Sequence, residues 1–572
     1  MKLDWVGRLA RNRIVWYSII AVVVLFGVVF RVIGLDRSIW IDEAWVANSV
    51  TAGSLAGMFR YDAWLQTSPP LFLLLVRIAV GILGLSPFAF RLIPLLFGFV
   101  AVACMFILTR RVLLPRYAIP AWTLLVLSPV AIDYSKALKQ YSGELAASTA
   151  LLLVCILYLQ RPTARRFWLL VAIAAVGLLM AYPVTFILPG IFLVVCFAPT
   201  QIGLSESGPA RSRWVGLIRG FTLAVVTGGV LMGIYLLCIV PNTSPSLTSF
   251  FAYARGGKSF ILAAFYHGYG LLYLLPLPGR VLGHQTLVGG VLVLFFLVGF
   301  ILACLQFRNG LRRWLEILVI CGLPCFLLII CNGLGRYPLT ARTSLFLLPE
   351  VILLFLCNLQ LILDFLVVRL RREWVDPLLD GAMVCATLLV VVLGLAKQPW
   401  GAVKAYSLHG TVPPGMNMVS IPEEDMASAV SYLRSSVQSG DIVWVHASCA
   451  ETFKLYARMT GWNDAGVRFG HTGWPCCPRG IAVDAGSGKD DDVRGDLNSG
   501  VPTSFTGTVW LVYTNRSYHW DYVGVDQSKI MEDVMRERGC IQKPTPTFFN
   551  IGVSEFDCRV AQSAAKGVRP VS

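Results

Sequence analysis

Long apolar runs recur along roughly the first 400 residues of this 572-residue chain, and they constrain the fold more than any other feature. Hydrophobic residues make up 56% of the sequence and charged residues only 14%, whereas soluble domains average about 25% charged. A run of about 20 apolar residues is the length that an α-helix needs to cross a bilayer. The composition therefore excludes a single soluble domain and predicts a polytopic α-helical membrane protein.

About eleven segments are apolar and long enough to cross the membrane. Arginine clusters lie between alternate segments, and the positive-inside rule places them in the cytoplasm together with the basic N-terminus. The net charge of +16 is therefore a topology signal, and we expect no nucleic-acid partner. The expected crossings are 14–34, 91–109, 118–133, 145–160, 168–182, 184–199, 217–240, 287–307, 314–331, 344–364 and 379–397.

One further apolar stretch, 70–85, would break this alternation if it crossed the membrane. It carries Arg77 in its middle and begins with a Pro-Pro pair, which suits the first turn of a helix. We expect it to lie in the outer interface or to re-enter from it, with a short true crossing as the alternative.

The residues after about 400 are more polar and predict a second unit. Strand-like and helix-like patterns alternate there, at 441–446 and 450–459 and again at 508–513 and 527–538. We expect a transmembrane module at 1–400 and a small extracytoplasmic α/β domain within 401–572, folded from about 420 to 560. The stretch 486–500 is expected to be a polar loop.

Five cysteines lie in this tail, and an oxidising compartment would allow some of them to pair. Cys476 with Cys477, and Cys540 with Cys558, are the candidate disulfides. The connectivity stays open, because five is an odd number.

The informative polar residues gather on the expected outer side. The first outer loop contains WIDEAW at 40–45, which places Asp42 and Glu43 beside the membrane surface. Carboxylates at a membrane are costly unless they are paired or used, although an acidic pair also suits the first turn of a helix. Two later outer segments, 133–144 and 335–342, add basic and aromatic residues: Lys136, Lys139, Tyr141, Glu144, Arg336, Tyr337 and Arg342.

An acidic pair facing a basic and aromatic collar suits group transfer from a phosphate-linked lipid. A carboxylate can accept a proton from an attacking hydroxyl or amine, while lysine and arginine stabilise the departing phosphate. The chain contains neither the P-loop pattern nor the GxGxxG dinucleotide pattern, which favours a lipid-bound donor over a nucleotide. Contact with lipid head groups explains any single cation of the collar equally well.

Several short segments, in this order and spacing, resemble glycosyltransferase family 39. This family belongs to the C-type membrane glycosyltransferases, alongside the protein O-mannosyltransferases and the lipid A aminoarabinose transferase. The resemblance covers about the first 400 residues. The segments are IDEA at 41–44, SPPL at 68–71, FRLIP at 90–94, LSP at 127–129, YS at 134–135 and KQY at 139–141.

The resemblance implies inverting transfer of a hexose or pentose from a polyprenyl-phosphate donor to a protein, lipid or glycan acceptor on the outer face. Asp42 would be the base or would orient the acceptor, and Glu43 would support it. The donor phosphate and sugar would be lined by Lys136, Lys139, Tyr141, Glu144, Arg336, Tyr337 and Arg342.

The resemblance leaves two features of this site open. Many relatives have Arg where Lys139 stands, so a bidentate phosphate clamp is not expected at that position. Some relatives hold a divalent cation with acidic residues of these loops, and Asp42 and Glu144 are the candidates here. A hard cation prefers more oxygen ligands than these two residues offer, so no cofactor is assigned.

Two other functions stay open: a transporter or flippase for a lipid-linked substrate, and a catalytically inactive relative that acts as a binding subunit. Transporters often place charges near the bilayer midplane in repeated halves, whereas the charges here lie at the outer edge. The expected location is the bacterial plasma membrane, with the endoplasmic reticulum as the alternative. The expected partners are the bilayer, the lipid-linked donor and an unidentified acceptor.

Overall fold

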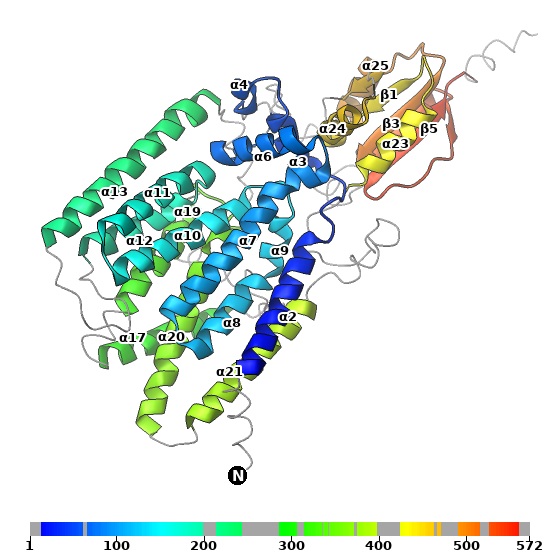
Figure 1. Ribbon diagram of the computed structural model, residues 1–572. Coiled ribbons are helices and arrows are strands. Elements are labelled where there is room, and N and C mark those ends of the chain that lie inside the picture. The colour runs from blue at the N-terminus through cyan, green and yellow to red at the C-terminus, as the bar shows by residue number, and fades with distance from the viewer. Residues whose placement is uncertain are drawn as a thin grey trace, which may run out of the picture.

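A computed structural model shows a helical bundle with a small sheet-containing unit at one end (Figure 1). The expected outer loop 241–286 lies almost entirely outside the described residues, as do Cys476 and Cys477. The structure describes residues 13–60, 64, 66–197, 213–242, 285–305, 314–334, 336–340, 342–370, 375–396, 424–462, 466–470, 490–514 and 526–559.

The bundle confirms a polytopic helical membrane protein. Seven of the described helices are long and apolar enough to cross a bilayer, or eight if one bent pair forms a single span. The count of about eleven crossings stays a prediction. The bundle helices are α2 (Arg13–Val32), α7 (Pro87–Val112), α8 (Pro115–Val126), α9 (Pro129–Ser135), α10 (Tyr141–Gln160), α11 (Ala164–Met180), α12 (Val184–Phe197), α13 (Arg213–Ile234) with η1 (Tyr235–Ile239) and η2 (Val240–Asn242), α17 (Gln285–Leu305), η5 (Leu318–Gly322) with α19 (Leu323–Gly333), η6 (Leu345–Leu347) with α20 (Leu348–Leu370), and α21 (Val375–Ala396).

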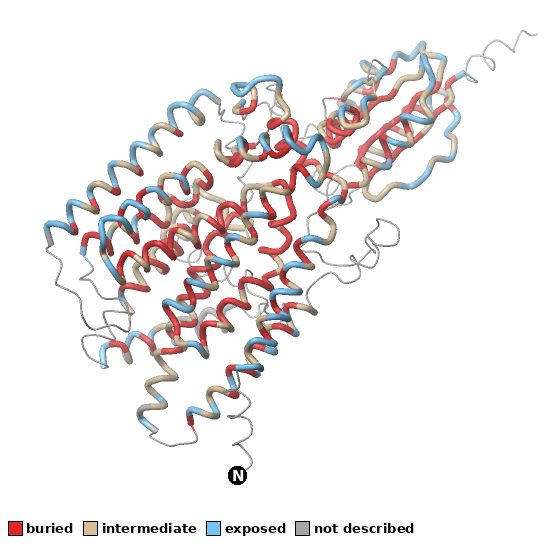
Figure 2. The backbone as a smooth tube through the Cα atoms, viewed as in Figure 1, coloured by how far each residue is buried: buried red, intermediate tan, exposed pale blue. Residues whose placement is uncertain are grey.

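Burial separates the central helices from the peripheral ones (Figure 2). Most residues of α10 are buried, and this helix packs against α7 and α11. In contrast, α2 and α13 expose large apolar side chains, among them Leu25 and Phe221. Apolar surfaces of this kind are typical of helices that face lipid.

Two short helices lie across the end of the bundle that adjoins the sheet, namely α3 (Ile41–Val50) and α6 (Pro70–Leu83) (Figure 1). A 14-residue helix such as α6 is about 21 Å long, which is less than the apolar thickness of a bilayer. This length supports the interfacial placement expected for 70–85. A single helical turn, α4 (Leu55–Met58), follows α3.

The second expected outer loop is shorter than its sequence indicated. Pro129 begins α9 after a bend of 51° from α8, and the Ser128 side chain caps α9 by accepting the Ala131 amide. The helix continues to Ser135, and α10 begins at Tyr141. Only residues 136–140 connect the two helices, so most of the expected loop 133–144 is helical.

The C-terminal unit contains a five-stranded sheet in the order β2-β1-β3-β5-β4. β1 (Ile442–Val445) is parallel to β2 (Val467–Phe469) and to β3 (Thr508–Thr514), whereas β5 (Ile551–Asp557) is antiparallel to β3 and to β4 (Ile541–Lys543). The expected strands at 441–446 and 508–513 are confirmed as β1 and β3. The predicted domain boundary near residue 400 falls outside the described residues.

Helices cover both faces of this sheet. The apolar side chains of α23 (Met426–Ser436) and α24 (Ala450–Thr460) join the core on one face, where η7 (Ala447–Cys449) precedes α24. Those of α25 (Asp490–Gly500) and α27 (Gln527–Glu537) form the core on the other face. The expectation of a loop over 486–500 was wrong from Asp490 onward, because Val493 and Leu497 share a buried helical face.

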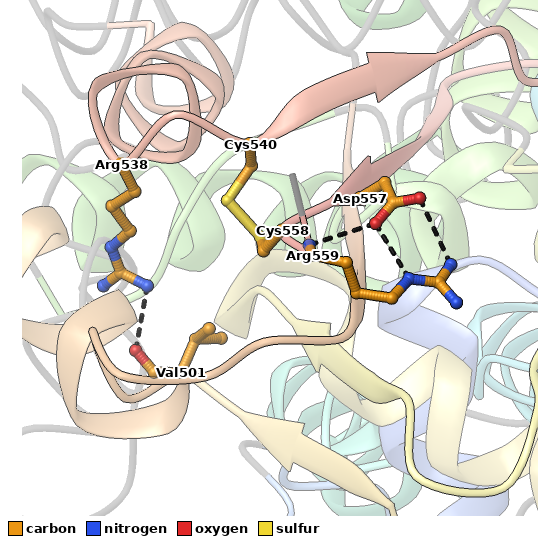
Figure 3. The surroundings of a disulfide bond; sticks show 6 residues. All are labelled: Val501, Arg538, Cys540, Asp557, Cys558 and Arg559. Atoms are coloured by element: carbon orange, nitrogen blue, oxygen red, sulfur yellow. Dashed lines mark hydrogen bonds and ion pairs between the residues drawn. A yellow bond between two sulfur atoms is a disulfide. The ribbon is translucent and has the colours of Figure 1, made fainter. Parts of the chain in front are cut away.

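A disulfide joins Cys540 to Cys558 and so connects the start of β4 to the end of β5 (Figure 3). Nearby, Arg538 donates a hydrogen bond to the Val501 carbonyl, and Asp557 pairs with Arg559. The pairing agrees with one of the two candidate disulfides from the sequence. Cys449 is a free, buried thiol.

Candidate functional site

The expected acidic pair lies in the first turn of α3, where carboxylates interact favourably with the helix dipole. The two side chains point into different surroundings. Glu43 is fully buried, whereas the side chain of Asp42 keeps 16% of its surface exposed. Only Asp42 is therefore open to a substrate.

Glu43 forms an ion pair with Arg91 of α7. Arg91 donates two hydrogen bonds to its carboxylate, at 2.9 and 2.5 Å, and the Leu138 amide donates a third at 2.6 Å. Burial opposes ionisation of Glu43, but Arg91, Arg37 and the Leu138 amide together hold the pKa of this carboxyl below its usual range. Any support that Glu43 gives Asp42 comes through the backbone of α3.

Arg91 also organises the chain that leads into α3. Its guanidinium donates to the carbonyl oxygens of Leu35 and Arg37, at 2.8 and 2.5 Å, and to that of Ser38 at 3.1 Å. The sequence indicated Arg91 only as part of the FRLIP segment. The available signal in the sequence was an arginine at the start of an apolar stretch, and the structure shows that this arginine is fully buried.

Arg342 and Lys139 lie beside Asp42. The Arg342 Nη1 atom is 3.1 Å from the Asp42 Oδ2 atom, so residues 300 positions apart form an ion pair. Lys139 lies in the turn between α9 and α10, and its ammonium interacts with Asp42 and Arg342. Burial lowers the pKa of Lys139, and Asp42 partly offsets this effect.

Lys136 has different partners from Lys139, although both lie in the same turn. Its Nζ atom donates to the Ile33 carbonyl at 3.4 Å, and its own carbonyl accepts from Arg37 at 3.3 Å. It also interacts electrostatically with the buried Asp133. Lys136 therefore helps to join this turn to the end of α2.

A group of aromatic and acidic side chains lies near the pair of Asp42 and Arg342. Tyr134 and Tyr141 pack edge to face, with ring centroids 4.9 Å apart, and Tyr141 interacts electrostatically with Arg342 and Glu144. Burial first, and then Glu144 and Tyr141, raises the pKa of Tyr337 well above its usual range. The structure thus brings Tyr141, Glu144 and Tyr337 together, as the sequence predicted.

Arg336 lies apart from this group. Its side chain is exposed and makes no hydrogen bond or ion pair with the residues that the structure describes. Tyr337 next to it packs edge to face on Phe186, at 5.2 Å between ring centroids.

Glu350 of α20 is a buried carboxylate that the sequence did not single out. It accepts a hydrogen bond of 2.7 Å from Ser148, which lies one turn below Glu144 on α10. One carboxylate oxygen of Glu144 and one of Glu350 have no hydrogen-bond partner among the described residues. An acidic residue within an apolar helix was the available signal.

Among the described residues, the acidic side chains do not form a metal-binding group. Within the described ranges, no three His, Cys, Asp or Glu side chains lie close enough to hold a metal ion together. Asp42 pairs with Arg342, so the candidate pair of Asp42 and Glu144 lacks a third ligand there.

Comparisons with known proteins agree with the resemblance seen in the sequence. The family model described as dolichyl-phosphate-mannose-protein mannosyltransferase matches residues 67–218. This match confirms the resemblance to the C-type membrane glycosyltransferases over that segment. No curated protein sequence matches the chain.

Solved structures of low sequence identity resemble the chain along most of its length. ArnT from Cupriavidus metallidurans bound to undecaprenyl phosphate is 12% identical, with a TM-score of 0.48 over 94% of this chain and 97% of that chain. Its apo state is 13% identical, with a TM-score of 0.48 over 95% and 98%. The Archaeoglobus fulgidus oligosaccharyltransferase tethered with an acceptor peptide is 13% identical, with a TM-score of 0.45 over 96% and 74%.

Proposed function

We propose that this membrane protein is a glycosyltransferase that moves a sugar, with inversion, from a polyprenyl-phosphate donor to an acceptor. The observation that carries the proposal is the cluster of Asp42, Arg342 and Lys139 at the end of the bundle beside α3. It combines a partly exposed carboxylate with two cations, and it adjoins the segment that matches a mannosyltransferase family.

The proposed step forms one bond and breaks one bond. An acceptor oxygen or nitrogen attacks the anomeric carbon of the sugar, and Asp42 takes the proton from that atom. The bond between the anomeric carbon and the phosphate oxygen breaks on the opposite face of the sugar. Its electron pair leaves with the polyprenyl phosphate, so the configuration at the anomeric carbon inverts.

Arg342 and Lys139 would stabilise the departing phosphate. A guanidinium has five N–H groups, so Arg342 can contact the phosphate while one nitrogen stays near Asp42. Lys139 is a cation whose burial is unfavourable, and a phosphate in this place would supply a counter-charge. Both cations would act most strongly as negative charge develops on the leaving oxygen.

Polar groups near the pair would contact the sugar. Tyr141, Glu144 and Tyr337 offer hydroxyl and carboxylate groups that can hydrogen-bond to sugar hydroxyls. The proposal places this site and the C-terminal domain on the outer face of a bacterial plasma membrane. The sugar, the polyprenol and the acceptor are left unassigned.

The test is transfer of radiolabelled sugar from a panel of polyprenyl-phosphate sugars by the full-length protein in lipid. Asp42→Asn should lower transfer by about 100-fold or more while the protein stays folded, because a general base typically contributes that much. Asp36→Asn, a change at an exposed residue of the same connection, should leave transfer unchanged.

A fully active Asp42→Asn protein would refute the proposed base. If no donor is turned over by folded wild-type protein, the transport and inactive-subunit alternatives gain support. Flux of a labelled lipid-linked sugar across vesicles would then distinguish those two alternatives.

A further inference from the structure

We infer that the C-terminal domain completes the catalytic site, with Glu424 and Tyr456 as positioning residues that hold the start of α3 and thereby place Asp42. The inference rests on the proposed function, because it assumes that Asp42 acts on the acceptor. It assigns these two residues to the transfer reaction.

The amides at the start of α3 need hydrogen-bond acceptors from elsewhere in the chain. The first backbone N–H groups of a helix have no partner within that helix. Trp40, at the N-cap position, supplies no side-chain cap. Glu424 instead accepts a hydrogen bond of 3.2 Å from the amide of Ile41, the first residue of α3. Tyr456 accepts one of 2.7 Å from the amide of Ile39, in the segment that leads into the helix.

Both contacts are shielded from water. Glu424 is 1% exposed and Tyr456 is 4% exposed, so water cannot easily replace either acceptor. A carboxylate at a helix N-terminus is also favoured by the helix dipole. Burial raises the pKa of Tyr456, so its phenol stays neutral.

Further contacts align the rest of α3 with the C-terminal domain. The Asn48 amide donates to the Glu451 side chain at 2.7 Å, and Arg458 donates to Asn48. Both partners of Asn48 belong to α24, which packs along α3 beside the bundle (Figure 1). The helix that carries Asp42 is therefore held by a domain that follows it by almost 400 residues.

The opposite end of α3 is held by α6. Arg77 of α6 donates to the carbonyls of Val50 and Ala52, at 3.1 and 2.8 Å. A helix of 10 residues has little stability of its own, so its position depends on these contacts. If the contacts at its start are removed, Asp42 can move relative to Arg342 and Lys139.

Such a movement should affect the chemical step more than donor binding. A displacement of about 1 Å at a reacting group can cost about 100-fold in rate. The donor phosphate would still meet Arg342 and Lys139, which lie in other segments of the chain than α3. We therefore expect kcat to fall while the KM for the donor changes little.

The experiment compares Glu424→Ala, Glu424→Gln and Tyr456→Phe in the full-length protein in lipid. Two conservative changes in the same domain are the controls. Asp425→Asn alters the cap of α23, and Tyr432→Phe removes a hydroxyl that makes no hydrogen bond with the described residues. The measurements are kcat and donor KM per folded molecule, and hydrogen exchange of peptides that cover residues 38–45.

We expect Glu424→Ala and Tyr456→Phe each to lower kcat by about tenfold and to speed exchange at residues 39 and 41, with donor KM within about twofold of wild type. Glu424→Gln keeps an oxygen acceptor and should restore most of kcat. Both controls should behave as wild type.

Unchanged kcat in both variants, with Asp42→Asn inactive, would overturn the positioning role and leave the proposed function standing. A loss of activity only in proportion to the unfolded fraction would also overturn it. If the wild type transfers no sugar, the proposed function fails. Hydrogen exchange alone then tests whether Glu424 and Tyr456 hold the start of α3. Unchanged exchange at residues 39 and 41 would then overturn the positioning of α3.

Discussion

Asp42 and Glu43 are neighbours in the sequence, but their surroundings assign them different tasks. Asp42 is partly exposed beside two cations, whereas Glu43 is buried between Arg91 and the Leu138 amide. The sequence indicated an acidic pair and could not separate the two roles. Their difference depends on which face of the first helical turn meets α7, and this is a matter of tertiary packing.

The structure predicts that Glu43→Gln mainly destabilises the protein. The change would leave Arg91 buried without a counter-charge, and breaking a buried ion pair typically costs about 3–5 kcal/mol. Asp42→Asn removes a partly exposed pair and should cost about 1 kcal/mol or less. Thermal unfolding of both variants in the same detergent would measure the difference, and equal stabilities would contradict it.

The pKa of Glu43 gives this difference a pH dependence. Because that pKa is lower in the folded protein than in the unfolded chain, the unfolded chain binds more protons as the pH falls. The stabilisation is therefore complete above the ordinary glutamate pKa of about 4.3 and is lost as the pH falls through the folded value. The stability gap between wild type and Glu43→Gln should be constant from about pH 7 to pH 5, and a gap that closes within that range would refute the assignment.

Among the elements, α6 carries an arginine in an apolar stretch, and the reason for it lies in another helix, α3. The sequence placed an arginine within an apolar stretch, which indicated that 70–85 is not an ordinary crossing. The structure supplies the reason, because Arg77 caps the carbonyl end of α3. A basic residue at that position is favoured by the helix dipole.

Arg77→Leu should therefore loosen α3 without disturbing the apolar surface of α6. The loss of hydrogen bonds from a charged group typically costs about 1.5–3 kcal/mol. Arg77→Lys keeps the charge near the same carbonyls and serves as the matched control. Hydrogen exchange of the amides at 48–52 should become faster in the leucine variant, and its thermal unfolding should occur at a lower temperature. Unchanged exchange would argue against the cap.

The elements also show which parts of the fold local patterns can predict. Apolar runs and the βα alternation predicted the bundle helices and the strands β1 and β3, because periodicity and length are local properties. The bonds from Ile39 and Ile41 to Tyr456 and Glu424 span 417 and 383 residues, and no local pattern encodes them. The resemblance pointed to both Arg342 and Asp42 by position, whereas the ion pair between them emerges only from the folded chain.

At the scale of the whole molecule, opposite ends of the bundle carry different charge arrangements. α6 and α3, the helix that carries Asp42, lie at the end beside the sheet (Figure 1). At the other end, Arg116 pairs with Asp364 and Asp376, and it lies 3.6 Å from Asp380. Arg116 belongs to a cluster that the positive-inside rule assigns to the cytoplasm.

This arrangement predicts the orientation of the protein. α10 begins near Asp42 and has 20 residues, so it is about 30 Å long and ends on the opposite side of a bilayer. Ala164, an exposed residue just after α10, should then face the cytoplasm, whereas the exposed Ser439 of the C-terminal domain should face outward. The disulfide between Cys540 and Cys558 agrees with an oxidising environment for that domain.

Labelling with a charged, membrane-impermeant maleimide would test the orientation in cells that express single-cysteine additions. Ser439→Cys should react in intact cells, and Ala164→Cys should react only after permeabilisation, with the unmodified chain as the background control. The reverse pattern would place the Asp42 cluster in the cytoplasm, where the proposed outer-face transfer could not take place. Equal labelling of both positions in intact cells would show that the 20-residue span of α10 does not separate them.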